Sequence, residues 1–384
     1  MHFKLAVMLL GVSCASCSSI TFSEDIAQTA ALASAANLQR HLESITAFGP
    51  RPASNVIVQG LTLQYLEQEL QTLGISTERE TFELTPSSKL VLSLETASGK
   101  SERLEIPGVH FGKNISQARV VHGQAAAWGV LDRLDGYGIE FGHAEAIDQF
   151  NLLATIPGTL APERVLELSA HYDTVPGTVG ADDNTSGVVA LLEVARLLQI
   201  NPPACTIRLC FFAAEEIGLL GSKEHVRLMQ ENASLDRLVG LINLDAVGHF
   251  TGEPNSQTSP TRIPLVVWPP STGDFLTIIG ANGSAELGHL IEDAGDLYVP
   301  DLRTYSLARI GGSFPDARRS DHAHYWDRNI PAIFLTDTGE FRSDNYHRPS
   351  DDLENVDVEA LRKVTALAYA SAASAANQAA REAR

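Results

Sequence analysis

Cysteine is scarce in this chain. Of its four cysteines, Cys14 and Cys17 lie in an N-terminal apolar segment, and only Cys205 and Cys210 remain in the body of the sequence. So few cysteines exclude a disulfide framework. Cys205 and Cys210 flank one strand-like run, ACTIRLC, five residues apart. Side chains at that spacing face opposite sides of a strand, so we expect two buried free thiols.

Positive charge is also scarce. The chain has 28 Lys and Arg against 47 Asp and Glu, which gives a formal net charge of -19. Such an excess of negative charge repels phosphate backbones and anionic lipid headgroups. We therefore expect neither nucleic acid nor an anionic membrane surface as a partner. The composition says nothing about the oligomeric state.

The apolar run at the N-terminus is short. It extends from Leu5 to Val12, follows one basic residue and precedes several small residues. That pattern predicts an export signal over residues 1–17 and is too short for a transmembrane span. Cys14 loosely fits a lipoprotein processing site and Cys17 fits less well, so an N-terminal lipid anchor is one alternative. We expect an exported protein that is periplasmic, anchored to the envelope or secreted.

The rest of the chain, residues 18–384, alternates strand-like and helix-like segments. With 384 residues and 44% hydrophobic content it is long enough to bury one large core. Short apolar runs predict strands at STERETFEL, KLVLSLET, NLLATI, RVLELSAH, TIRLCFFAA, LVGLINLD and PAIFLTD. Amphipathic or apolar segments predict helices over residues 26–48, 56–74, 185–199, 216–231, 285–295 and 356–380. This order predicts a single α/β domain with a mixed, largely parallel central sheet that helices cover on both faces.

Residues 250–312 depart from that alternation. They include Pro254, Pro260, Pro264, Pro269 and Pro270. Prolines at this density break regular structure, so we expect a loop-rich insertion beside the site that shapes a substrate pocket. A surface excursion without a role is the alternative.

Five short segments each bring a carboxylate or an imidazole to the end of a run that predicts a buried strand. They are HYDTVPGTVGADDNTSG, which starts at His171, FFAAEEIGLLGS, INLDAVGH, RSDHAHYW with Asp321 and His322, and DNYHRPSDD with His347. In largely parallel sheets, ligands bind beyond the carboxyl ends of strands. The segments therefore predict one site.

These side chains suffice for two metal ions. Zinc binds imidazole nitrogen and carboxylate oxygen, and a hydrolytic site leaves a position open for water. His171 and Asp245 can bind one ion and Glu216 and His347 the other, with Asp183 between them. Taken singly, each segment also has an ordinary structural explanation, such as a polar turn or an acidic first helical turn. The conjunction and its order favour the metal site.

Two further carboxylates have predicted roles beside the ligands. Glu215 is the spare carboxylate that can act as a general base towards a water. In His171-Tyr172-Asp173 the period of two places both polar side chains on one side of a strand. We expect the carboxylate of Asp173 to accept the second ring proton of His171 and so to orient it.

The order and the residues of these motifs resemble those of the co-catalytic zinc aminopeptidase family. Glutamate carboxypeptidase and glutaminyl cyclases are more distantly related to that family. The resemblance covers about residues 40 to 380 and includes the lead-in FGPRPASN. It implies two zinc ions, with His171, Asp183, Glu216, Asp245 and His347 as ligands. Asp183, rather than Asp182, takes the bridging position. It also implies Glu215 as the general base and Tyr346 as a donor to the oxyanion.

The function that follows is hydrolysis of a peptide bond next to a free amino terminus. Carboxypeptidase or dipeptidase action, a glutaminyl cyclase activity and a receptor-like ectodomain without metal stay as alternatives. The stretch Asp183-Asn184-Thr185-Ser186-Gly187 keeps a continuation that cyclases tend to lose, and the ligand set is intact. Both observations favour the peptidase.

Overall fold

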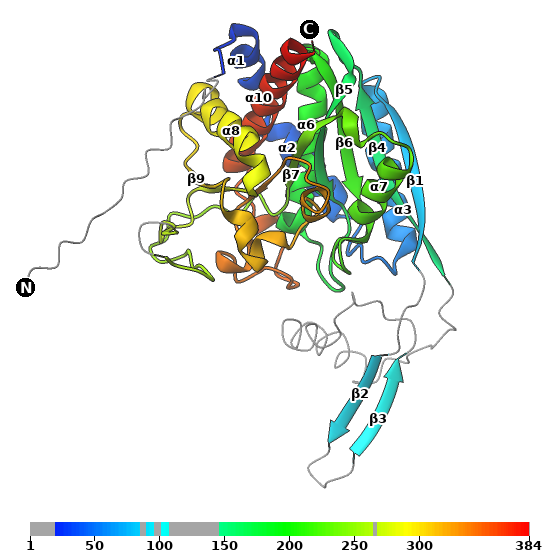
Figure 1. Ribbon diagram of the computed structural model, residues 1–384. Coiled ribbons are helices and arrows are strands. Elements are labelled where there is room, and N and C mark those ends of the chain that lie inside the picture. The colour runs from blue at the N-terminus through cyan, green and yellow to red at the C-terminus, as the bar shows by residue number, and fades with distance from the viewer. Residues whose placement is uncertain (1–19, 85–89, 96–100, 107–145, 264–266, 384) are drawn as a thin grey trace, which may run out of the picture.

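The computed structural model describes residues 20–84, 90–95, 101–106, 146–263 and 267–383 (Figure 1). The predicted export signal, with Cys14 and Cys17, lies outside the described residues. Within them, no helix combines the length and the apolar composition that crossing a membrane requires.

An eight-stranded sheet forms the centre of the described structure, with the strand order β1-β4-β6-β5-β7-β10-β8-β9. The strands are β1 (Ser76–Leu84), β4 (Ile147–Ile156), β5 (Ala161–His171), β6 (Cys205–Phe212), β7 (Leu238–Leu244), β8 (Leu276–Gly280), β9 (Thr304–Leu307) and β10 (Ala332–Thr336). The central pairs β6–β5, β5–β7 and β7–β10 are parallel, as is β8–β9, whereas β1–β4, β4–β6 and β10–β8 are antiparallel. The predicted mixed, largely parallel sheet is confirmed. Strands β2 (Leu90–Glu95) and β3 (Ser101–Ile106) form a separate antiparallel pair.

Helices cover both faces of this sheet. The longer described helices are α1 (Glu24–Ala30), α2 (Ala35–Thr46), α3 (Val56–Thr72), α6 (Gly187–Ile200), α7 (Leu220–Glu231), α8 (Ala285–Tyr298) and α10 (Val358–Glu382). Figure 1 shows α10, in red, beside α8 and α6, and its alanine-rich surface packs against β5, β6 and β7. Helix α7 and the short α9 (Ala323–Trp326) contact each other and pack on other strands.

The two cysteines of β6 mark these two faces. Cys205 belongs to the apolar core beneath α6 and α10, and Cys210 belongs to a second core that includes residues of α7 and α9. Both thiols are free and buried, as predicted. Burial raises the pKa of Cys205 to about 11, so its thiol stays protonated.

The parallel strands bring their carboxyl ends to one edge of the sheet. Strand β5 ends at His171, β6 ends shortly before Glu215, β7 ends directly before Asp245 and β10 ends directly before Asp337. Because these four strands are neighbours and run in the same direction, their following residues lie side by side.

Two predicted helices differ from the observed ones. The helix expected over residues 26–48 is broken between α1 and α2, because Glu193 accepts a hydrogen bond from the N–H of Ser34 at 2.8 Å and Ser34 caps α2. The helix expected from residue 216 begins only at Leu220. The carbonyl of Glu215 accepts the N–H groups of Gly218 and Leu219, which makes a tight turn before the helix.

The segment 250–312 is loop-rich only in its first part. Beyond Phe275 it forms β8, α8 and β9, and β8 pairs with β10 inside the central sheet. The expectation of a loop-rich insertion over the whole of residues 250–312 was therefore too broad. The apolar run LTIIG has the strand-like pattern that the nearby prolines obscured.

Candidate functional site

His171, at the end of β5, faces three carboxylates. The ring is 1% exposed, and its Nε2 atom lies 3.2 Å from Oδ1 of Asp183, 3.4 Å from Oδ1 of Asp245 and 3.9 Å from Oε2 of Glu215. Imidazole nitrogen and carboxylate oxygen thus converge on one point at the edge of the sheet.

His347 forms the second half of the site from a loop that follows β10. Its Nε2 atom lies 3.0 Å from Oδ2 of Asp183 and 3.1 Å from Oε2 of Glu216. The two carboxylate oxygens of Asp183 therefore face two different histidines. The ligand atoms form two groups, His171 with Asp183 and Asp245, and Asp183 with Glu216 and His347.

The donor set fits zinc. The Nε2 atom of His171, Oδ2 of Asp183 and Oε1 of Glu216 are buried and make no hydrogen bond of regular geometry within the described residues. Nε2 of His171 and Oδ2 of Asp183 lie 3.2 Å and 3.0 Å from other ligand atoms, as donors around a shared cation do. Nitrogen and oxygen donors of this kind are those that zinc prefers in hydrolytic sites.

The electrostatics of the site point the same way. Burial lowers the pKa of His171, but the carboxylates of Glu215 and Asp245 outweigh it and hold that pKa well above its usual value. Burial acts likewise on His347, yet Glu216 and Asp183 raise its pKa to about 10. The two histidines thus keep their protons at neutral pH when no other positive charge balances the carboxylates. A metal cation can take the place of those protons.

Glu215 lies at the start of the turn between β6 and α7 and is 8% exposed. Burial raises the pKa of Glu215 well above its usual value, and the charges of Asp245 and Glu216 add to the effect against the opposing influence of His171. It also groups with His171 and Glu216. Its carboxylate lies farther from Nε2 of His171, at 3.9 Å, than the carboxylates of Asp183 and Asp245 do.

The carboxylate of Asp173 makes shorter contacts elsewhere than the predicted one with His171. The Nδ1 atom of His171 lies 3.1 Å from the backbone carbonyl oxygen of Asp173 and 3.6 Å from its carboxylate. That carboxylate instead accepts the N–H groups of Glu215 at 3.0 Å and Glu216 at 3.3 Å. Strand β5 ends at His171, so the alternation of a strand no longer governs the direction of Asp173.

Tyr346 stacks on the neighbouring ligand. Its ring lies 3.8 Å from that of His347, centroid to centroid, with 16° between the planes. Burial and the charge of Asp183 raise the pKa of Tyr346 well above its usual value, so the phenol keeps its proton and can donate it in a hydrogen bond.

Asp321 and His322 lie in a turn before α9 and not at the end of a strand. His322 points away from the cluster: its Nε2 atom donates to the carbonyl of Ala317 at 2.7 Å and its ring stacks on Phe334. Asp321 is fully buried, and burial raises its pKa to about 7. Neither side chain belongs to the two ligand groups.

Sequence reasoning missed a buried chain of hydrogen bonds behind Asp245. Ser169 donates to Asn243 at 2.7 Å, Asn243 donates to Ser320 at 2.7 Å and Ser320 donates to Oδ2 of Asp245 at 2.5 Å. These contacts direct the other oxygen of Asp245 towards His171. The alternation Glu167-Leu-Ser169-Ala-His171, with polar residues on one side of an otherwise apolar strand, was the available signal.

Arg51, from the FGPRPASN segment, was also missed as an individual residue. Its guanidinium is fully buried and donates to the carbonyls of Tyr172 at 2.8 Å and Val179 at 2.9 Å, and to the hydroxyl of Thr185 at 2.7 Å. It thereby ties the loop after His171 to the segment that contains Asp183.

A pocket opens beside Asp245 and Tyr346. Its apolar wall includes Val267, Phe275, Ile279, Phe314 and Phe334. Arg319 and Glu340 also line it and form an ion pair at 2.5 Å. The loop-rich part of residues 250–312 contributes Gln257, Pro260 and Pro269 to the lining, so this segment borders the site.

Two curated relatives resemble the chain over about half its length. The uncharacterized protein YfbL of Escherichia coli (strain K12) is 35% identical over 207 residues, which cover 51% of this chain and 62% of the relative. Aminopeptidase YwaD of Bacillus subtilis (strain 168) is 30% identical over 223 residues, which cover 56% of this chain and 42% of the relative. The chain therefore matches less than two thirds of either protein.

Solved structures share the fold across most of the chain. An aminopeptidase from Aneurinibacillus sp. strain AM-1 superposes with a TM-score of 0.63 at 18% identity, over 90% of this chain and 95% of that one. A glutaminyl cyclase from Fimbriiglobus ruber superposes with a TM-score of 0.56 at 16% identity, over 89% and 96%. At these identities the likeness concerns the fold alone.

The model of peptidase family M28 matches residues 151–372, which is more than half of the chain. The matched region contains the second half of β4, the strands β5 to β10 and both ligand groups, from His171 to His347. With the fold, the donor set and this match in agreement, the chain belongs to peptidase family M28.

Proposed function

We propose that this chain is a zinc-dependent exopeptidase that hydrolyses the N-terminal peptide bond of peptides. His171 and Asp245 would hold one of two zinc ions, Glu216 and His347 the other, and Asp183 both. The observation that carries the proposal is the position of Asp183, whose two oxygens lie 3.2 Å and 3.0 Å from the ring nitrogens of two histidines.

When bound, zinc polarises a carbonyl group and lowers the pKa of a water. Glu215 is the buried carboxylate beside both ligand groups, and its role is to take a proton from the attacking water and deliver it to the leaving amine. Asp173 holds the backbone of Glu215 and Glu216 through two hydrogen bonds and so fixes where both carboxylates point.

Tyr346 is the proposed donor to the oxyanion. Its ring is fixed by stacking on His347, and it lines the pocket together with Asp245. A donor held in place before the reaction stabilises the charge that develops on the carbonyl oxygen.

The apolar pocket supports a preference for a large apolar first residue. It adjoins Asp245, and its wall includes Phe275, Ile279 and Phe334. Burying an apolar side chain there removes its surface from water. The name of the relative YwaD, an aminopeptidase, agrees with cleavage at the amino terminus.

The decisive experiment treats the purified protein with peptides that carry free or blocked amino termini and identifies the products by mass spectrometry. We expect release of the first residue from free peptides, fastest for leucine-like residues, and no release from blocked ones. Loss of the last residue would assign a carboxypeptidase, and cleavage of dipeptides alone a dipeptidase. Ring closure of N-terminal glutamine would assign a cyclase. A protein that catalyses no reaction and binds no metal would be assigned as receptor-like.

We also propose export, on the basis of the apolar run and the small residues within residues 1–17. Fractionation of cells that express the full chain tests this. Recovery of the protein in the cytoplasm with an intact N-terminus would contradict it. Mass spectrometry of the Cys14→Ser and Cys17→Ser variants tests the lipid anchor.

A further inference from the structure

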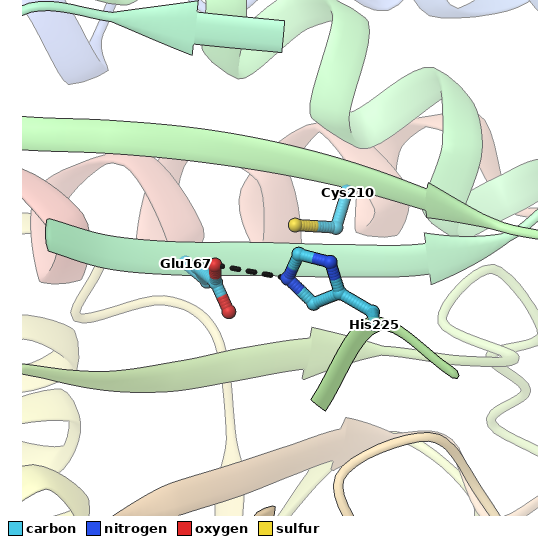
Figure 2. Close-up of side chains that lie close together, drawn as sticks. All are labelled: Glu167, Cys210 and His225. Atoms are coloured by element: carbon cyan, nitrogen blue, oxygen red, sulfur yellow. Dashed lines mark hydrogen bonds and ion pairs between the residues drawn. The ribbon is translucent and has the colours of Figure 1, made fainter. Parts of the chain in front are cut away.

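A second buried polar cluster lies beyond the site on the same strand, β5. Figure 2 shows Glu167 of β5, Cys210 of β6 and His225 of α7 with their side chains directed towards one another. All three are 0% exposed. Glu167 and His171 lie four residues apart on β5, so they face the same side of the sheet.

The imidazole of His225 lies between two carboxylates. Its Nδ1 atom lies 2.8 Å from Oε2 of Glu80 on β1, and its Nε2 atom lies 3.2 Å from Oε1 of Glu167. Carboxylates accept hydrogen bonds, so both ring nitrogens must donate and the ring is an imidazolium. Burial lowers the pKa of His225, but Glu167, Glu80 and Cys210 outweigh it and hold the pKa well above its usual value.

The cluster is neutral and its hydrogen bonds are made. Oε1 of Glu167 also accepts from Arg208 of β6 at 3.0 Å, and Oε2 accepts from the hydroxyl of Tyr325 of α9 at 2.7 Å. The charged groups are then His225 and Arg208 against Glu80 and Glu167, and burial raises the pKa of Cys210 to about 12, which leaves its thiol neutral. Both ring nitrogens have partners and a cation already contacts Glu167, so these residues fit an ion-pair network better than a metal site.

His225 holds the first turns of α7, and α7 follows the turn that carries Glu215 and Glu216. The helix starts at Leu220, and the N–H of Gly221 donates to the carbonyl of Ala213 at 3.0 Å. A Cβ atom on Gly221 would lie 2.3 Å from that carbonyl oxygen, so the helix end presses directly on the end of β6.

The same turn is anchored at its base by Asn151 of β4. Its side chain accepts from the N–H of Ala213 at 3.1 Å, and it donates to the carbonyl of Gly221 at 2.9 Å and to Glu80 at 3.3 Å. Within the turn, Ala214 and Leu219 have φ values of 56° and 57°, which are costly for residues with a Cβ atom. A strained turn keeps its shape only if the elements at both ends are held.

We propose that His225 is a positioning residue for Glu215 and Glu216: clamped between Glu80 and Glu167, it holds α7 against β1 and β5 and so fixes the turn that presents both carboxylates. This inference rests on the proposed function in naming those two glutamates as general base and ligand. The contacts themselves are independent of it.

The test compares the full-length protein with the variants His225→Phe and Glu80→Gln. His225→Phe keeps a ring of similar size and removes both contacts. Glu80→Gln keeps the shape of the side chain and removes one charge, so it remains informative where the first variant does not fold. His289→Phe is the matched control, because His289 pairs with Glu292 at 3.0 Å on the surface of α8.

Three measurements are made: amide hydrogen exchange without metal, zinc affinity by competition with a chelator, and kcat and KM. We expect faster exchange in residues 213–221 of both variants, with exchange in β5 and β7 unchanged. The zinc ion held by Glu216 and His347 should bind about 10- to 100-fold more weakly, while the ion held by His171 and Asp245 should bind as in the wild type. The value of kcat should fall by a similar factor, with little change in KM. The control should match the wild type throughout.

Folded variants with wild-type exchange in residues 213–221 would overturn the proposal, as would a third zinc ion that the Cys210→Ser variant loses. These outcomes are separate from failure of the proposed function. A wild type without peptidase activity would contradict that function, while the exchange measurement would still decide the role of His225.

Discussion

The carboxylate of Asp173 accepts the backbone N–H of Glu215 at 3.0 Å, and its second oxygen accepts that of Glu216 at 3.3 Å. One side chain two residues beyond the end of β5 thereby sets the backbone of a turn that follows β6. The ring of His171 contacts the backbone carbonyl of Asp173.

Asp173→Asn should weaken zinc affinity or activity by about 10- to 100-fold without preventing folding. An amide has one acceptor oxygen where the carboxylate has two, so one of the two backbone contacts is lost. Chelator competition and steady-state kinetics measure the effect, and circular dichroism checks the fold. A variant indistinguishable from the wild type in both would contradict the orienting role.

Glu215→Gln should keep both zinc ions and lower kcat by a factor on the order of a thousand or more. The amide cannot carry the proton between water and the leaving amine, yet no ligand is removed. Glu231→Gln, on the exposed end of α7, is the control and should retain full activity. Substantial turnover by Glu215→Gln would contradict the assignment of Glu215 as the general base.

Asp183→Asn should disturb both zinc sites, whereas Glu216→Gln or His347→Asn should chiefly empty one. Both oxygens of Asp183 face ligand groups, and an amide nitrogen cannot replace the second oxygen. Elemental analysis after dialysis should give close to two zinc ions per chain for the wild type. A wild-type value near one would contradict the bridging role.

Arg51→Lys should destabilise the fold, because a single ammonium cannot reach the carbonyls of Tyr172 and Val179 and the hydroxyl of Thr185 together. Each buried carbonyl left without a donor costs about 1–3 kcal/mol. Chemical denaturation measures the loss. Arg40→Lys, at an exposed pair with Glu69, should change the free energy of unfolding by less than about 1 kcal/mol. Equal effects of the two substitutions would contradict the prediction.

The contribution of His225 to stability should decline at alkaline pH. Its pKa in the folded protein lies well above the ordinary value of 6.5, so folding favours the protonated ring. The stabilisation is fully present below about pH 6.5 and is lost as the pH rises through the folded pKa. Denaturation of metal-free wild type and His225→Gln across pH 6 to 10 should show the largest difference near pH 6. A difference that grows with pH would have the wrong sign.

The elements predicted best are those whose pattern is local. Strand β1 spans Ser76–Leu84, as the alternation of STERETFEL predicted, and the apolar run GLINL ends in Asp245 directly after β7. Helix α3 ends before Gly74, whose φ of 74° only glycine adopts freely. In each case, neighbouring residues carry the whole signal.

The predictions that were wrong or incomplete depended on contacts between distant residues. Glu193 interrupts the expected first helix at Ser34, 159 positions away along the chain. The chain turns after His171, so the carboxylate of Asp173 accepts the N–H groups of Glu215 and Glu216 and stays 3.6 Å from Nδ1 of His171. No local period encodes such contacts, because they depend on where two other segments end in space.

The sequence by itself determined the α/β alternation, the apolar strands and the order of the acidic and imidazole residues that end them. Those features follow from side-chain periodicity and from the rule that parallel strands present their carboxyl ends together. Only the tertiary structure decided that the two oxygens of Asp183 face His171 and His347, that Ser320 aims Asp245, and that His225 lies between Glu80 and Glu167. The reason is physical: a buried charge is stable only beside its partners, and which partners reach it depends on packing across the whole sheet.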